Sequence, residues 1–388
     1  MGRREYLRAI YDRYHRGSAE KKGMILDEFC RICDYHRKHA IRLLNRPRPE
    51  THPRPRRSRG PSYGRRVIQV LAQIWEAAGY PWSVRLKAML PLWLPWLRQR
   101  MALTPELERQ LRAISPRQID RRLLSRKRIL RRRMYGRTKP GTLLKHHIPI
   151  KTDHWDVTRP GFTEIDLVSH SGDCADGEFA HSFNLTDLHT TWTETRAVLG
   201  KGQTGIVAGL EEMRQSLPFP LQGIDSDNGS EFLNHHLVAY CRTQQIQFTR
   251  GRPYKKDDNA HIEQKNWTHV RRLIGWNRYD SATAVGLLND LYRHELRRMM
   301  NLFQPSVKLL RKQRIGSRLK RIYDSPQTPL DRVRASQNFD RAAVNALLRL
   351  RATTDPFQLA KTIERKIDHI AALARRPDSS ARVTSQTA

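Results

Sequence analysis

The chain has 388 residues, with 72 Lys and Arg against 38 Asp and Glu, a formal net charge of +34 and a pI near 10.9. This excess predicts a polyanionic partner, nucleic acid above all, and the length provides for two or three domains. The four cysteines indicate no disulfide framework, and the most apolar stretch, residues 88–97, is too short to span a bilayer, so we expect no membrane partner.

Residues 1–45 are expected to form a small helical unit. Apolar side chains recur at helical spacing as far as Phe29, a turn follows at Asp34, and the last helix, 36–44, is apolar on one side and basic on the other. This order is typical of a helix–turn–helix. Its basic face predicts DNA contacts from Arg37, Lys38 and Arg42.

The same unit contains four potential zinc ligands at steps of three residues, Cys30, Cys33, His36 and His39. On one helix such steps spread the ligands over half the circumference, whereas zinc fingers separate their pairs by about a dozen residues. We therefore favour core cysteines in a helix–turn–helix. Zinc stays open, because the turn at Asp34 alters the geometry.

A basic linker and a second helical unit follow. Residues 46–66 are rich in Pro and Arg, which predicts an extended linker. Over 67–135 a second helix–turn–helix-like unit is expected, with helices that start after Thr104 and Ser115, each followed by Pro. We expect the last of these helices to continue to Arg133. Its basic run is compatible with a solvated surface, but we favour DNA contacts from Arg121, Arg122, Arg126, Lys127 and Arg131.

From residue 150 the pattern changes to α/β. Strands are predicted at 162–169, 179–187 and 191–198, followed by a helix at 204–216, a strand at 221–226, a helix at 231–244, a strand at 246–250 and a long helix from about 257. This is the order of an RNase H-like mixed sheet, so we expect a catalytic core over 150–300. Residues 151–280 carry 14 basic and 18 acidic residues, which makes this core acidic between basic flanks.

Three carboxylates of the core predict a metal site: Asp166 within an apolar strand, Asp227 where a strand ends before Asn-Gly, and Glu263 where a helical pattern begins. Between the last two lie 35 residues. Carboxylates are the natural ligands of Mg²⁺ or Mn²⁺, and two such ions about 3.5–4 Å apart can activate the attacking oxygen and stabilise the leaving oxygen of a phosphodiester. Each acid has an ordinary alternative, such as an Asx turn at Asp227. In this order and spacing they favour a two-metal site.

The region after the core is basic. Residues 301–375 are expected to be less regular until helices at 340–351 and 355–375, and residues 376–388 are expected to be disordered. The basic side chains between 305 and 336 suit a clamp on a second duplex and, equally, a solvated surface.

Two segments resemble the integrase catalytic core of bacterial insertion-sequence transposases, a group related to retroviral integrases and Mu transposase. They are Ser226-Asp-Asn-Gly-Ser-Glu-Phe232 and Asn259-Ala-His-Ile-Glu-Gln-Lys-Asn266. Segments 26–44 and 301–308 resemble the helix–turn–helix ahead of such cores and the stretch just after them. On this resemblance, two metal ions are held by Asp166, Asp227 and Glu263.

The resemblance implies a transposase that cuts DNA at the ends of a mobile element and joins them to target DNA. Water would attack first and the freed 3′-hydroxyl second. Terminal-repeat and target DNA would be the partners of a homo-oligomer in the bacterial cytoplasm, associated with the nucleoid. Two alternatives are a metal-dependent RNase H-like nuclease that does not join DNA, and a helix–turn–helix regulator with a vestigial core.

Overall fold

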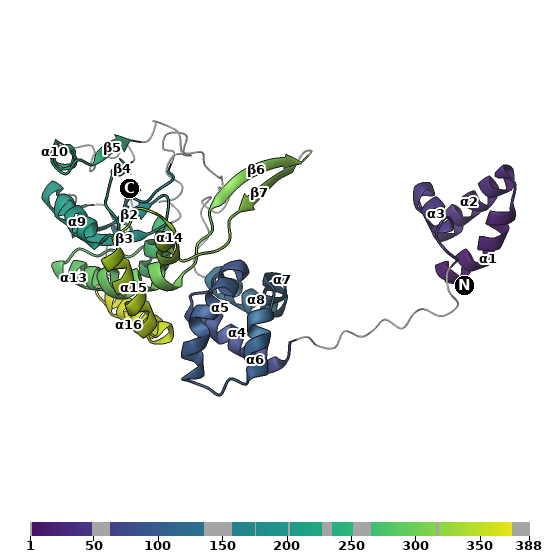
Figure 1. Cartoon of the computed structure of the whole chain (residues 1–388), viewed down its shortest axis with the longest axis horizontal. Helices are drawn as coiled ribbons and strands as arrows, with labels where there is room; N and C mark the ends of the chain where they lie inside the picture. Colours follow the sequence, from purple (N-terminus) through teal and green to yellow (C-terminus); the bar gives the residue numbers. More distant parts are fainter. Residues whose placement is uncertain are drawn as a thin grey trace, which may run out of the picture. The chain divides into compact units, whose positions relative to one another are not determined.

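The computed structural model describes residues 2–48, 63–135, 157–174, 176–200, 202–226, 235–250, 265–315 and 318–374. The chain divides into two compact units, Met1–Ser62 and Tyr63–Ala388, which are drawn in Figure 1. The predicted linker 46–66 falls largely, and the predicted tail 376–388 entirely, outside the described residues.

The first unit is a three-helix bundle of α1 (Arg3–Arg16), α2 (Ala19–Cys33) and α3 (Arg37–Leu44). Its core contains Phe29 and Leu44, both fully buried. The predicted turn is present at Asp34, which ends α2 in the left-handed conformation with φ 52°. Asp tolerates this conformation better than most residues.

The second unit begins with helices α4 (Arg65–Ala77), α5 (Ser83–Arg98), α6 (Pro105–Ala113), α7 (Pro116–Arg122) and α8 (Leu124–Tyr135). The expected helix starts are present, because the hydroxyls of Thr104 and Ser115 accept from backbone N–H groups at 3.2 and 3.3 Å. The single helix predicted to reach Arg133 is wrong. It is interrupted at Leu123, where the backbone has φ −91° and ψ 4°; the side chain of Leu123 is fully buried.

A mixed five-stranded sheet of order β3-β2-β1-β4-β5 forms the centre of the second unit. Its strands are β1 (Phe162–Ser169), β2 (Ala180–Asp187), β3 (Thr193–Leu199), β4 (Gly223–Ser226) and β5 (Gln247–Arg250). β1 pairs with β2 and β2 with β3 in antiparallel register, whereas β4 runs parallel to both β1 and β5. The predicted mixed α/β sheet is therefore confirmed, with each strand within two residues of its expected bounds.

Helices α9 (Gln203–Ser216) and α10 (His235–Thr243) pack on the sheet through an apolar cluster that includes Ile165, Phe183 and Leu210. Gly209 lets α9 approach closely. A Cβ at this position would lie 2.5 Å from the ring of Phe183.

A long helical stretch covers the free edge of β3. It consists of α13 (Ala282–Leu291) followed by the wide-turn π segments η3 (Tyr292–Leu296) and η4 (Met299–Phe303). The side-chain amide of Asn289 bonds both backbone groups of Ala197 at 2.8 Å, and that of Asn301 bonds both of Thr193 at 2.9–3.0 Å. These asparagines hydrogen-bond backbone N–H and C=O groups at the edge of β3, as a sixth strand would.

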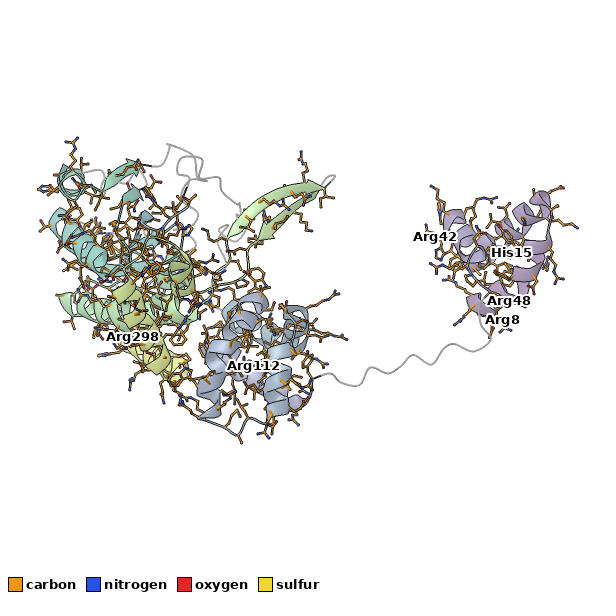
Figure 2. The ribbon with its side chains drawn as sticks, in the orientation of Figure 1. Arg8, His15, Arg42, Arg48, Arg112 and Arg298 are labelled. Carbon is orange, nitrogen blue, oxygen red and sulfur yellow. The ribbon has the colours of Figure 1, made fainter. Side chains whose placement is uncertain are left out.

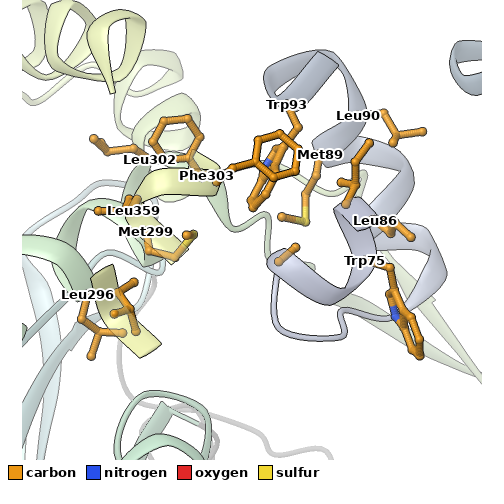
Figure 3. Packing of buried hydrophobic residues seen from close by; sticks show 14 of the residues in the cluster. Trp75, Leu86, Met89, Leu90, Trp93, Leu296, Met299, Leu302, Phe303 and Leu359 are labelled. Carbon is orange, nitrogen blue, oxygen red and sulfur yellow. The ribbon is translucent and has the colours of Figure 1, made fainter. Parts of the chain in front are cut away.

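The C-terminal region contains a hairpin of β6 (Leu309–Ile315) and β7 (Arg318–Tyr323), then α14 (Pro329–Ala335), α15 (Arg341–Thr353) and α16 (Pro356–Ala372). The expectation of an irregular chain before residue 340 is therefore wrong. Apolar residues from α4–α7, the β3-covering helix and α14–α16 form one core. Figure 3 shows Trp93 and Met89 of α5 near Phe303 of η4.

None of the described helices is long and apolar enough to cross a membrane.

Candidate active site

Asp166 is half-buried at the centre of β1, the middle strand of the sheet. Its Oδ2 accepts from Nδ2 of Asn266 at 2.5 Å, and its Oδ1 accepts from the backbone N–H of Leu167 at 2.7 Å. Asn266 begins the π segment η2 (Asn266–Arg271), which continues into α12 (Arg272–Ile274). The carboxylate therefore has a fixed orientation.

A chain of amides and hydroxyls holds Asn266 in place from the far side. Asn184 of β2, which lies opposite Asp166 in the strand register, donates from Nδ2 to Oδ1 of Asn266. Its own Oδ1 accepts from the hydroxyl of Thr195 on β3 at 2.6 Å. Both Asn184 and Thr195 are buried. Three strands and η2 thus share one polar network that ends on the Asp166 carboxylate, and such networks give well-defined side-chain positions.

The other two predicted metal ligands, Asp227 and Glu263, lie outside the described residues, so the three-carboxylate site stays a prediction. Strand β4 ends at Ser226, one residue before Asp227 in the sequence, and Ser226 pairs in register with Ile165 of β1. Asn266 follows Glu263 by three positions. Asp166 therefore lies beside the strand that precedes one of these acids in the sequence and the helix that follows the other.

Lys265, which sequence analysis did not single out, is half-buried next to Asn266. Its Nζ donates to the carbonyl of Thr191 at 3.3 Å. Burial lowers the pKa of Lys265 to about 7, and the charges of Arg85 and Arg332 contribute to the same shift. Burial also holds the pKa of His269 well below its ordinary value. The surroundings of the Lys265 amine and the His269 ring are thus partly desolvated and electropositive.

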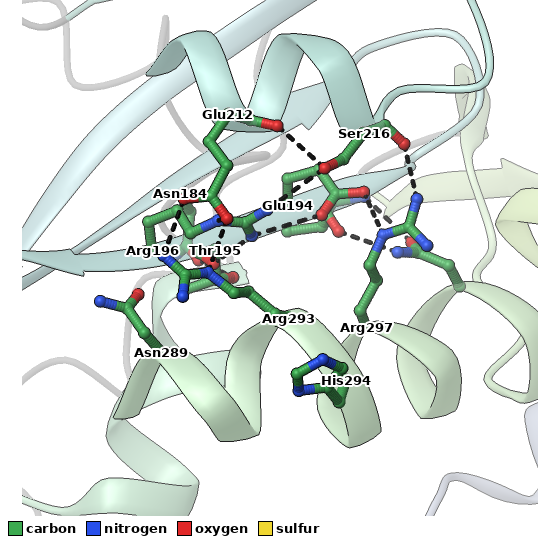
Figure 4. Close-up of polar contacts among 12 residues, drawn as sticks. Asn184, Glu194, Thr195, Arg196, Glu212, Ser216, Asn289, Arg293, His294 and Arg297 are labelled. Carbon is green, nitrogen blue, oxygen red and sulfur yellow. Dashed lines mark hydrogen bonds and ion pairs between the residues drawn. The ribbon is translucent and has the colours of Figure 1, made fainter. Parts of the chain in front are cut away.

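A second carboxylate of the sheet, Glu194 on β3, has different surroundings (Figure 4). It is fully buried, and its Oε1 accepts from Nε of Arg297 at 2.7 Å and from the indole N–H of Trp192 at 2.9 Å. The guanidinium of Arg196 lies 3.6 Å from its Oε2. Arginines neutralise this acid, so it belongs to the framework.

The predicted DNA contacts of the first unit are exposed on α3. Arg37, Lys38 and Arg42 all face solvent, and Figure 2 labels Arg42 on α3. Arg37 is paired with Asp27 of α2. Their role on DNA stays a prediction.

The predicted contacts of α7 and α8 differ in how much of their charge is already compensated. Arg121 is exposed and Arg122 is half-buried. Arg126 pairs with Glu76 at 2.8 Å, and Lys127 pairs with Asp120 at 2.5 Å. The side chain of Arg131 lies outside the described residues. Two of the five basic residues are thus paired with acids of the same unit.

The candidate zinc ligands do not converge. Cys33 is buried in the bundle core and burial raises its pKa; the Nδ1 of His36 accepts from the N–H of Lys38 at 3.3 Å, and the ring of His39 lies against Tyr35. Within the described ranges, which include all four ligands, no group of three His, Cys, Asp or Glu side chains is arranged to hold a metal. The structure therefore agrees with core cysteines.

Comparison with known proteins identifies a family whose function is not established. No protein-family model matches the chain. It is 40% identical over 333 residues to the uncharacterized protein y4rM of Sinorhizobium fredii, a match that covers 85% of this chain and 94% of that protein. The chain belongs to the family of y4rM.

Among solved structures, the catalytic core domain of BIV integrase aligns with 29% of this chain and 68% of its own length, at 16% identity and a TM-score of 0.24. A likeness this slight carries no argument about function.

Proposed function

We propose that the chain is a DNA strand-transfer enzyme, a DDE transposase with an RNase H-like core, and that its site consists of Asp166, Asp227 and Glu263. The main support for the proposal is the bond from Asn266 to Asp166. It joins the central strand to the helix that follows Glu263 in sequence, while the parallel neighbour β4 leads into Asp227. Three antiparallel strands followed by alternating helices and strands support the same core.

The surroundings of Asp166 suit a hard divalent cation. Its ligand atoms are carboxylate oxygens, the donors that Mg²⁺ and Mn²⁺ prefer, and an amide from Asn266 orients them, as outer partners of metal ligands do. Two such ions bound by the three carboxylates would supply activation of the attacking oxygen and stabilisation of the leaving oxygen.

The protein's own residues would position the DNA. The guanidinium groups of Arg85 and Arg332, whose charges act on Lys265 next to Asn266, give this part of the site a positive potential that draws in a phosphodiester backbone. In this proposal residues 1–45 and 67–135 bind the element ends, 150–300 carries the chemistry and 301–375 adds basic contacts. A homo-oligomer is expected on DNA, because each chain carries one carboxylate triad and two ends must be joined.

The test uses full-length protein and DNA with the inverted repeats that flank its gene. Asp166→Asn and Asp227→Asn should each reduce cleavage and strand transfer about 1000-fold or more, because each removes a charge from a shared cation site. DNA binding should remain near the wild-type level. Gel shifts and product analysis in Mg²⁺ on one preparation measure both.

Asp225→Asn is the matched control. Asp225 lies in β4, two residues before Asp227 in the sequence, and its Oδ1 accepts from the hydroxyl of Thr249 at 2.7 Å. This variant should cleave and join DNA normally. Substantial cleavage by either of the other two variants would remove that residue from the site, and cleavage without joined products would favour the nuclease alternative.

A further inference from the structure

The β6–β7 hairpin is the most basic segment of regular structure after the core. Residues 309–323 contain six Lys and Arg and no Asp or Glu. Figure 1 shows the two strands extending away from the five-stranded sheet as a narrow ribbon. Side chains on both faces are exposed, Arg311 and Lys320 on one face and Arg314 on the other. A two-stranded ribbon without a covered face is marginally stable in water, which indicates that a partner completes it.

The apolar side chains of the ribbon are also exposed. Leu310, Ile315 and Leu319 are 65%, 55% and 52% exposed. The strand register puts Arg314 opposite Leu319 and Arg311 opposite Ile322, so apolar and basic residues share each face. A bilayer or an apolar protein surface would require one face to be apolar throughout. Basic residues along the strands also discourage the addition of a protein strand.

We propose that β6–β7 enters the major groove of duplex DNA, an inference that rests on the proposed function only in taking DNA as the substrate. The major groove is about 12 Å wide and admits a two-stranded ribbon. Phosphates line the walls of the groove, where they can pair with Arg and Lys. Base edges and thymine methyl groups form its floor, where the methyl groups can contact Leu and Ile. Seven residues of strand extend roughly 23 Å, less than one helical turn of about 34 Å, so the ribbon can contact several successive base pairs in the groove.

The root of the ribbon is fixed to the body of the second unit. Asp324, just after β7, accepts from the N–H of Lys308 and from Arg332, both at 2.6 Å. Arg332 also donates to the carbonyl of Ser306 at 3.0 Å. The Nζ of Lys308 donates to the carbonyl of His189, in the turn between β2 and β3, at 2.9 Å. DNA bound along the ribbon would therefore be held at a set position relative to the sheet.

The same turn connects the ribbon to the candidate active site. The hydroxyls of Ser306 and Thr191 are 2.7 Å apart, and the carbonyl of Thr191 accepts from Lys265. The next residue is Asn266, which orients Asp166. A short path of hydrogen bonds thus links the ribbon root to the carboxylate. In this proposal the path fixes the distance between the DNA segment bound by the ribbon and the phosphate that is cleaved.

The test measures binding without a divalent ion, so a failure of the chemistry would leave its result unchanged. The probes are a mixed-sequence duplex of about four helical turns and one of its strands alone. The variant Arg311→Gln/Arg314→Gln/Lys320→Gln changes three exposed ribbon residues. Its control, Arg341→Gln/Arg349→Gln/Arg365→Gln, removes the same charge from exposed positions of α15 and α16. Circular dichroism and gel filtration verify that both remain folded.

Loss of three phosphate contacts should lower the slope of log affinity against log salt by about 2–3 and duplex affinity by about 10–100-fold. The control should bind like the wild type. Guanine N7 lies in the major groove, so the wild-type chain should protect it from dimethyl sulfate and the ribbon variant should not.

A second variant, Leu310→Ser/Leu319→Ser, leaves the charge unchanged. It should retain the salt slope and lose part of the N7 protection. Affinity and protection of the ribbon variant equal to those of the control would overturn the proposal. Protection confined to the minor groove, or undiminished duplex binding combined with loss of single-strand binding, would also overturn it.

Discussion

Asp166 and Glu194 are carboxylates on the same sheet with opposite surroundings. Glu194 is fully buried and accepts from the guanidinium of Arg297 and the indole of Trp192. Asp166 is half-buried and accepts from the amide of Asn266 and a backbone N–H. A cation on a carboxylate cancels its charge and ties it to the framework. A neutral amide sets the orientation of a carboxylate without adding a positive charge of its own.

We propose that the partners of each carboxylate distinguish a structural acid of the sheet from a reactive one. Removal of one partner of a buried ion pair strongly destabilises the folded protein, because the other charge remains buried and uncompensated. A carboxylate oriented by an amide suits a ligand that brings positive charge. We therefore expect substitutions at the two positions to affect different properties, stability at Glu194 and chemistry at Asp166.

The largest expected effect on stability comes from Glu194→Gln. It should lower the free energy of unfolding by about 3–5 kcal/mol, because Arg297 and Arg196 lose their common acid while their side chains remain only 18% and 3% exposed. Urea unfolding followed by circular dichroism measures the change.

The control is Glu211→Gln, which removes the charge of a more exposed acid that accepts from Arg214, Gln215 and Tyr240 and should cost less, about 1 kcal/mol. Asp166→Asn should also leave the unfolding free energy nearly unchanged. If Asp166→Asn destabilises the chain as much as Glu194→Gln, the distinction between the two acids is wrong.

A smaller effect is expected at the positioning residue Asn266. Asn266→Ala should reduce DNA cleavage about 10–100-fold, as does the loss of an outer partner of a metal ligand. The variant should also require more Mg²⁺ for half-maximal rate, since Asp166 would no longer be oriented. A magnesium titration of the cleavage rate distinguishes this role from a purely structural one.

Thr195→Val removes the hydroxyl at the far end of the same network and should shift the magnesium requirement in the same direction by less. Asn277→Ala, a loop residue near η2, serves as the control. An unchanged magnesium requirement in Asn266→Ala, whatever its rate, would show that Asn266 does not act on the metal ligand.

The strands of the sheet could be predicted from sequence because their apolar residues recur in short runs separated by turn residues such as Asp187. The position of Asp166 within a strand followed from the same pattern. Its partner Asn184 could not be predicted, because the strand register that places the two side by side depends on pairing between segments. Asn266 lay within a motif used for the resemblance, but nothing local indicated its contact with Asp166.

The β6–β7 hairpin was missed for a different reason. Alternation of apolar and polar residues identifies a strand only where one face is buried, and both faces of this ribbon are exposed and basic. The break between α7 and α8 was missed because Leu123 is compatible with a continuous helix, and only its backbone conformation, with ψ 4°, identifies it as the interruption.

The smallest expected effect concerns basic residues, and it compares those paired with an acid of the chain with those exposed to solvent. Arg126 and Lys127 were predicted to bind DNA, but Glu76 and Asp120 already neutralise them. A DNA phosphate would have to displace these carboxylates from the two basic side chains, and the exchange of one anion for another would gain little electrostatic energy. Arg126→Gln/Lys127→Gln should therefore change the salt slope of duplex binding by less than about 0.5, whereas Lys38→Gln/Arg42→Gln on the exposed face of α3 should lower it by nearly 2, because each phosphate contact contributes about 0.9. Titrations at four salt concentrations with full-length protein resolve the two. An equal decrease of the salt slope in both variants would mean that DNA displaces the acids. Ion pairs within the chain would then not show which basic residues bind DNA.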